Sequence, residues 1–117
     1  MASIAHESYV QSVRNRVYVV ALGMLDGSIP FLEGAITLAS LRHEAAVEDS
    51  DEDFLAFVAI ASETDDLPIG QSRKHWSVEA LEKHQPLIEK ATQWAKEVGT
   101  APCQSLVSRF NNKNTFG

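Results

Sequence analysis

Apolar residues in this chain recur at spacings of three and four, and no stretch keeps the strict alternation of a half-buried strand. The first such series is Val10, Val13, Val17, Val20 and Met24. A three-four spacing places side chains on one face of an α-helix, whereas a strand requires a spacing of two. The pattern therefore predicts an all-α protein.

Turn and cap residues divide this pattern into about five helices. The first is expected from about Glu7 to Leu25, with Asp26-Gly27 ending it and Ser28 capping the next. The second helix has two apolar stripes between residues 29 and 39. A helix that is apolar on two sides is expected inside a bundle rather than at its edge.

A short central helix is expected at "FLAFVAIA", residues 54–61, which is apolar all round. By composition this run also fits a buried strand. Ser50 and Asp53, however, have the spacing of a helix-capping box, with aspartate in place of the usual glutamate. The cap and the three alanines favour the helix.

The C-terminal part of the pattern predicts two further helices. One begins after its cap Ser77, has a kink or break at Pro86, and ends at Gly99. The other is opened by Thr100 and Pro102. The expected architecture is a compact bundle of about five helices.

The length of 117 residues is that of one domain, so 1–117 is expected to be a single unit with a frayed tail at 111–117. The longest strongly apolar run, Val17 to Leu25, is far shorter than the ~20 residues that span a bilayer. The N-terminus lacks the pattern of a secretory signal, and the lone Cys103 fits a reducing compartment. We expect a cytoplasmic protein that does not enter the membrane.

Negative charge is concentrated in one part of the chain. The formal net charge is −6, but residues 48 to 66 contain eight acidic residues and no lysine or arginine, so the remainder (ten basic, eight acidic) has a net charge of +2. Such a segment repels nucleic-acid phosphates and anionic lipids and attracts basic proteins. The eight acidic residues are Glu48, Asp49, Asp51, Glu52, Asp53, Glu63, Asp65 and Asp66.

The segment "DSDEDF" partly matches a calcium-binding motif, because Asp49-x-Asp51-x-Asp53 has the spacing of the first ligands in an EF-hand loop. That loop also needs glycine at its sixth position and glutamate at its twelfth. Phe54 and Ile60 occupy those places. The sequence therefore predicts no calcium site.

Other chemical motifs are absent from the sequence. The four histidines show no metal-ligand spacing, and no glycine-rich phosphate loop or serine-nucleophile motif occurs. Cys103 shares an apolar face with Leu106, Val107 and Phe110, so it is expected to be buried rather than reactive. We predict no catalytic residue, no metal and no cofactor.

The stretch "IASETDDLPIGQSRKHW", residues 60–76, combines acidic, basic, turn-forming and aromatic residues and is the part of the chain least explained by a purely structural role. Its acids crowd the C-terminal end of the third helix, where the helix dipole is already negative. The acids of 48–53 lie at the other end of this helix, roughly 15 Å away. Solvated faces are a common explanation for such clusters, but the two are also within reach of one partner. Apolar anchoring would then come from Leu67, Ile69 and Trp76.

Three segments resemble a family of small uncharacterised bacterial proteins: "LDGSIPFLEGAITLASLRHE", "DEDFLAFVAIASETDDLPIGQSRKHW" and "CQSLVSRF". The resemblance spans about residues 22 to 110 and implies a bacterial setting. Small acidic bacterial proteins of this kind often resemble immunity proteins, which bind and neutralise a toxin. The resemblance implies no catalytic residue.

Our leading hypothesis is a non-enzymatic binding protein, most plausibly an immunity protein. Its acidic surface would occlude the basic active site of a cognate protein toxin. One alternative is a small helical enzyme whose site assembles only in the fold. Another is a homo-oligomeric adaptor that uses the two-striped second helix. The enzyme would gather two or more of Glu33, Glu44, Glu63, His43 and His75 in one pocket.

Overall fold

The computed structural model describes residues 3–69 and 74–111, and within these ranges all regular structure is helical. Four α-helices are present there, where the sequence predicted about five. They are α1 (Ser3–Asp26), α2 (Phe31–Leu41), α3 (Glu52–Glu63) and α4 (Val78–Arg109). The predicted frayed tail falls almost entirely on residues 112–117, which lie outside the described residues.

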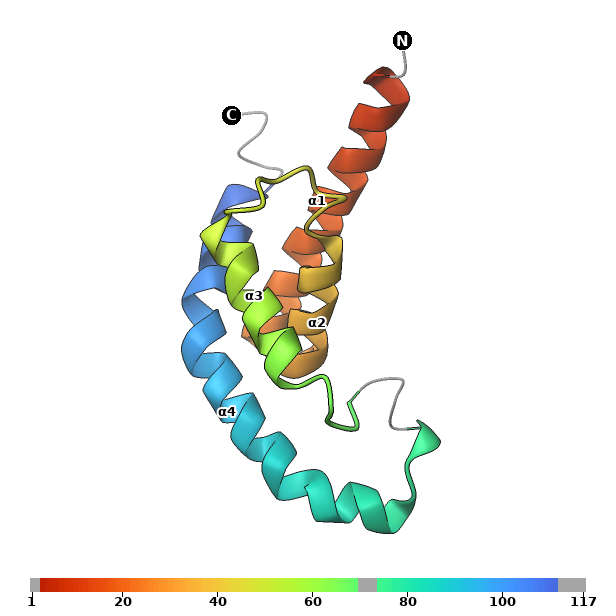
Figure 1. The fold of residues 1–117 in the computed structure, drawn as a ribbon. Helices are drawn as coiled ribbons and strands as arrows, with labels where there is room; N and C mark the ends of the chain where they lie inside the picture. Colours follow the sequence, from red (N-terminus) through yellow and green to blue (C-terminus); the bar gives the residue numbers. More distant parts are fainter. Residues whose placement is uncertain (1–2, 70–73, 112–117) are drawn as a thin grey trace.

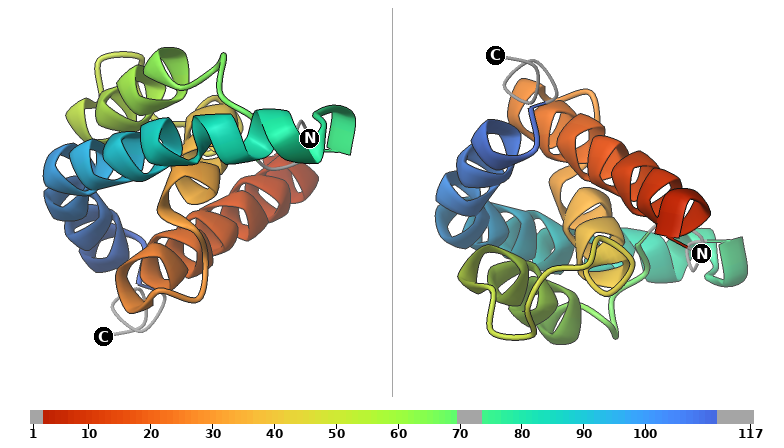
Figure 2. Two further views of the ribbon diagram at one scale, coloured as in Figure 1. Left: turned by 90° about the horizontal axis from the view of Figure 1, so that it is seen from below. Right: turned by 90° about the horizontal axis from the view of Figure 1, so that it is seen from above.

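The missing fifth helix is the C-terminal part of α4, which continues through Pro86, Gly99 and Pro102. Gly99 does not end the helix. It is buried, and a Cβ there would lie 3.0 Å from the Phe31 ring and 3.2 Å from Ile60. Gly99 therefore allows α2 and α3 to approach α4 closely. Figure 2 shows that α4 changes direction toward its C-terminal end, and the helix contains two prolines, Pro86 and Pro102. Proline bends a helix because it lacks an N–H donor and crowds the preceding turn.

Two other helix starts differ from the prediction by a few residues. α3 is capped by Asp51 instead of Ser50, and the Asp51 carboxylate accepts hydrogen bonds from the backbone N–H groups of Asp53 and Phe54. α2 begins at Phe31, after Pro30. The backbone N–H of Ser28 instead donates to the Asp26 carboxylate. Aspartate and serine are both good caps, so adjacent candidates are not separated by residue type.

Buried side chains from all four helices form one core. α2 packs against each of the other three helices and lies between them in Figure 2, as its two apolar stripes predict. This packing leaves little of α2 for an interface with a second copy; Ile36 is its one large apolar residue with more than a third of its surface exposed.

α3 packs antiparallel to the end of α4 (Figure 1). Of the described helices, none is long and apolar enough to cross a membrane.

Candidate partner-binding surface

The acids at the start of α3 are partly committed to the fold itself. The Arg109 guanidinium, at the end of α4, donates to Asp51 at 2.7 and 3.1 Å and to Asp53 at 2.8 Å. The hydroxyl of Ser105 also donates to Asp53, at 2.7 Å. The hydrogen bond from Arg109 holds the pKa of Asp51 below its usual value. Asp51 and Asp53 therefore fasten α3 to α4, a role that their positions in the sequence do not reveal.

The remaining acids at this end of α3 lie exposed among basic side chains. Glu48, Asp49 and Glu52 face solvent. The backbone carbonyl of Asp49 accepts from Arg42 at 3.4 Å, and the Asp49 carboxylate lies 3.9 Å from the imidazole of His43. Arg14, which donates to the Ala45 carbonyl at 2.9 Å, borders the same shallow depression as Glu48 and Arg109. Three arginines thus offset part of the negative field here.

At the opposite end of α3, Glu63 borders a depression that Lys90 of α4 also lines, but the two side chains form no ion pair. Glu63, Asp65 and Asp66, which we call the 63–66 cluster, are exposed and form no ion pair within the described residues. The next basic residues along the chain after this cluster are Arg73 and Lys74. Arg73 lies outside the described residues, and Lys74 forms no ion pair with either aspartate. Like Glu48 and Glu52, the three acids of this cluster therefore form no ion pair among the described residues.

The three predicted apolar anchors lie in two places. Leu67 and Ile69 follow the 63–66 cluster directly and are half-buried. Trp76 lies before α4, where its ring meets that of His84 edge to face with centroids 4.8 Å apart. The Nδ1 of His84 donates to the Ala80 carbonyl at 2.8 Å. His84 therefore packs against Trp76 and is held by the backbone of its own helix.

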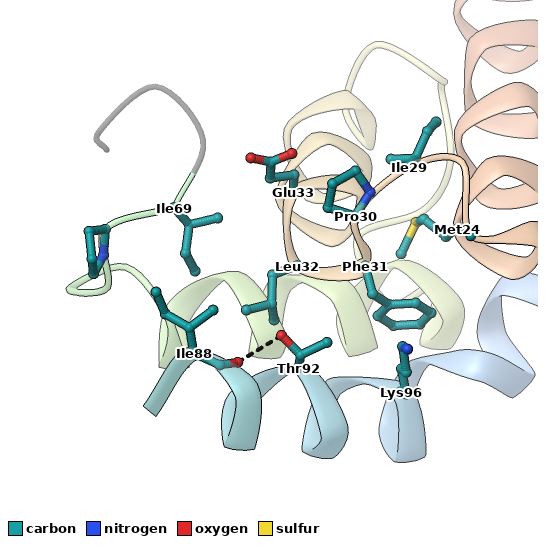
Figure 3. A pocket seen from close by; sticks show the side chains of 12 residues that line it. Met24, Ile29, Pro30, Phe31, Leu32, Glu33, Ile69, Ile88, Thr92 and Lys96 are labelled. Atoms are coloured by element: carbon teal, nitrogen blue, oxygen red, sulfur yellow. Dashed lines mark hydrogen bonds between the residues drawn. The ribbon is translucent and has the colours of Figure 1, made fainter. Parts of the chain in front are cut away.

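A pocket of about 490 Å³, which the sequence did not predict, lies beside Ile69 (Figure 3). Its walls come from three stretches of the chain, residues 24–33, 68–69 and 88–96. Two of its residues were candidates from the sequence, namely Ile69 as an apolar anchor and Glu33 in the enzyme alternative. No local sequence pattern marks such a convergence. The pocket is lined by Met24, Gly27, Ile29, Pro30, Phe31, Leu32, Glu33, Pro68, Ile69, Ile88, Thr92 and Lys96.

The groups considered for catalysis are spread over the molecule. Of the five residues of the enzyme alternative, only Glu33 lines the pocket of Figure 3. Glu44 accepts a hydrogen bond from the hydroxyl of Tyr9 at the far end of α2. Cys103 is buried beside Met24, and burial raises its pKa to about 12, so it is protonated at neutral pH. The expectation that Cys103 is a packing residue is confirmed. In the described ranges, no three His, Cys, Asp or Glu residues are arranged to hold a metal ion.

The sequence matches the family model DUF2489, described as a protein of unknown function, over residues 3–104. The chain belongs to the DUF2489 family. This confirms the resemblance to an uncharacterised family, while the family description gives no support for toxin immunity. No curated protein and no solved structure matches the chain.

The DUF2489 match includes some features of the candidate surface and not others. The 63–66 cluster and every residue of the pocket lie inside the matched region. Arg109 lies beyond its end. The ion pairs of Asp51 and Asp53 therefore depend on a residue outside the DUF2489 match.

Proposed function

We propose that this DUF2489 protein is a non-enzymatic binding module that receives a basic site of a partner protein. The case that we favour is an immunity protein that acts in the bacterial cytoplasm and occludes the active site of a toxin domain. The observation that carries the proposal is the 63–66 cluster: three exposed carboxylates that form no ion pair among the described residues, next to half-buried Leu67 and Ile69.

No ion pair among the described residues links the 63–66 cluster to the rest of the fold. Carboxylates at the C-terminal end of a helix oppose the helix dipole and are unfavourable by some tenths of a kcal/mol each. Asp51 and Asp53 differ because Arg109 compensates them. Uncompensated surface charge is well suited to attract and orient a partner of opposite charge, and it speeds association.

Other features of the protein agree with a basic protein as the partner. The exposed acids Glu48, Asp49 and Glu52 extend the negative field to the opposite end of α3, with Leu67, Ile69 and Trp76 as the apolar residues of the surface. Nucleic acid is disfavoured because its phosphates would be repelled. No observation favours the oligomeric adaptor, since α2 is enclosed by α1, α3 and α4.

The proposal is tested by capture from a lysate of the native cell with three baits. The first is the wild-type protein and the second has Glu63→Gln, Asp65→Asn and Asp66→Asn. The third, a control with the same change in charge, has exposed acids of α4 replaced, namely Glu82→Gln, Glu89→Gln and Glu97→Gln.

We expect a basic protein to bind the wild type and the control but not the 63–66 variant. With the purified partner, loss of the three charges should slow association about tenfold at low salt and have little effect at high salt. Equal capture by all three baits, or an unchanged association rate, would contradict the proposal. Neutralisation of a toxin by the captured complex would then identify the immunity case.

A further inference from the structure

The pocket of Figure 3 is a hollow between the first turn of α2, residues 68–69 and one face of α4. Its floor is made of buried side chains, among them Met24, Phe31 and Leu32. Its rim includes the exposed Pro30 and Lys96. The hollow is therefore reached from solvent at the surface of the protein.

Its lining determines which chemical group it can hold. Apart from Glu33, Thr92 and Lys96, the side chains that line it are apolar. The hydroxyl of Thr92 already donates to the Ile88 carbonyl at 2.7 Å, as Figure 3 shows. A hollow of about 490 Å³ with so few free polar groups suits one large apolar group better than a polar ligand.

The charges around the rim determine what should flank that apolar group. Glu33 lines the pocket, and Asp26 precedes the lining residue Gly27. Hydrogen bonds from Ser28 lower the pKa of Asp26, so its carboxylate is ionised at neutral pH. Asp66 lies two residues before the lining residue Pro68, a Cα separation of at most about 7.6 Å.

Against these three carboxylates, the residues that line the pocket include one lysine, Lys96, which also lines an adjoining depression together with Asp26. The surroundings are therefore negative, which disfavours an anionic ligand such as a fatty acid. Positively charged flanking groups would be attracted on most sides of the opening.

We propose that the pocket takes one large apolar side chain from a basic segment of the partner protein. This inference rests on the proposed function and deepens it, because the pocket adjoins Ile69 and lies within a few residues of the 63–66 cluster. The 63–66 cluster attracts the segment, and the pocket anchors it. Apolar groups that fill a desolvated pocket are the usual hot spots of protein interfaces.

Three synthetic peptides of five residues probe the pocket, with binding followed by NMR titration of the whole protein. They are KKLKK, KKSKK without the apolar side chain, and EELEE with the opposite charge. KKLKK should shift the resonances of Leu32, Ile69 and Ile88. It should bind about fivefold more tightly than KKSKK, because one leucine side chain is partly buried. EELEE should bind at least about tenfold more weakly than KKLKK.

Three substitutions test where KKLKK binds and whether the charge at the rim of the pocket contributes to binding. Lys96→Glu removes the one lysine that lines the pocket and should tighten the binding of KKLKK about threefold, an effect in the range of a single exposed charge pair. Lys83→Glu makes the same change at an exposed position of α4 outside the pocket and should have a smaller effect. Thr92→Trp fills the pocket and should reduce KKLKK binding to the level of KKSKK.

Several results would overturn the inference. These are equal binding of KKLKK and KKSKK, resonance shifts away from the pocket, no binding of KKLKK, or weaker binding after Lys96→Glu. Decanoate bound in the pocket of the wild type and lost from Lys96→Glu would assign the pocket to an anionic amphiphile. Capture of the native partner that depends on the 63–66 cluster but not on Thr92 would overturn the pocket alone and leave the proposed function standing.

Discussion

Arg109 shows how much of this fold depends on one side chain near the C-terminus. Its guanidinium binds Asp51 and Asp53 and also lies 5.2 Å from the centre of the Phe110 ring. Phe110 in turn packs against Phe54, with ring centroids 6.3 Å apart. The end of α4 and the start of α3 are thus joined by polar and aromatic contacts at the same place.

We predict that Arg109→Met lowers the free energy of unfolding by about 1–2 kcal/mol at neutral pH. The estimate is smaller than for a fully buried pair, because 38% of the Arg109 side chain is exposed. The loss still exceeds that of an ordinary surface pair, since two carboxylates with 12% and 22% exposure lose their cation. Urea unfolding measures the difference. Arg16→Met, at an exposed position of α1, is the matched control and should change stability by less than about 0.5 kcal/mol.

The same contact predicts how stability depends on pH. The pKa of Asp51 is lowered in the folded state, chiefly by the hydrogen bond from Arg109. A group with a lowered folded-state pKa contributes stability that is fully present above its unfolded pKa of about 4. That contribution is lost as the pH falls through the lower folded value. The difference between the wild type and Arg109→Met should therefore shrink between neutral pH and about pH 3; a constant difference would contradict this account.

The sequence could not reveal this pairing. Residues 48 to 66 contain no lysine or arginine, so the eight acids appeared as one uncompensated segment. Arg109 is 56 residues away from Asp53 in the chain, and only the packing of α3 against α4 brings the two together. Local patterns predict which residues are charged, but compensation between distant residues depends on the fold. The 63–66 cluster stays a predicted partner site because its carboxylates form no ion pair among the described residues.

At the scale of helices, the sequence patterns predicted correctly where helices occur, but they did not predict correctly where some of the helices begin and end. The three-four spacing identified α1 and α2, the cap and the alanines identified α3, and the cap Ser77 of α4 is confirmed by its hydrogen bond from the Ala80 N–H at 3.1 Å. The break predicted after Gly99 was wrong because glycine has two uses. It ends helices through its backbone freedom, and it also lets neighbouring elements approach closely. The sequence alone does not separate these uses.

The two prolines inside α4 are expected to have opposite effects when replaced. Pro86 is exposed, so its cost to the helix is not offset by packing. Pro86→Ala restores a backbone hydrogen bond and should raise the free energy of unfolding by about 1 kcal/mol, after allowance for the more flexible unfolded chain. Pro102 is half-buried in the C-terminal part of α4, which brings Arg109 to α3. Pro102→Ala favours a straight helix and should lower stability by about 1 kcal/mol.

Urea unfolding of the two variants, with helix content measured by circular dichroism, tests this pair. A shift of the same sign for both prolines would show that Pro102 does not support the packing of the C-terminal turns.

The molecule as a whole is longer than its chain length requires. Its radius of gyration is 15.6 Å and its dimensions are 53 × 28 × 26 Å, whereas a compact domain of this length has a radius of gyration of about 13 Å. The first turns of α1 and the first half of α4 extend beyond the shared core (Figure 1). No residue from 7 to 12 or from 78 to 94 is fully buried. These two projecting segments account for the additional length.

Backbone amides in the projecting segments should exchange their hydrogens faster than those in the core. Local opening costs little where few apolar contacts hold a helix in place. We therefore expect amides of 7–12 and 78–90 to exchange faster, in exchange measured by mass spectrometry, than those of 54–60 and 95–106, which contain buried core residues. Exchange in 78–90 as slow as in 95–106 would contradict this expectation.

One contact makes the behaviour of the α1 projection separately testable. The hydroxyl of Tyr9 donates to the Glu44 carboxylate at 2.5 Å, and this bond ties the start of α1 to the turn after α2. Tyr9→Phe removes the bond but keeps the ring, so exchange should accelerate in 7–12 and stay unchanged in 78–90. If both segments accelerated, the two projections would belong to one cooperative unit. Acceleration in 7–12 alone would show that each projection is held by its own contacts with the core.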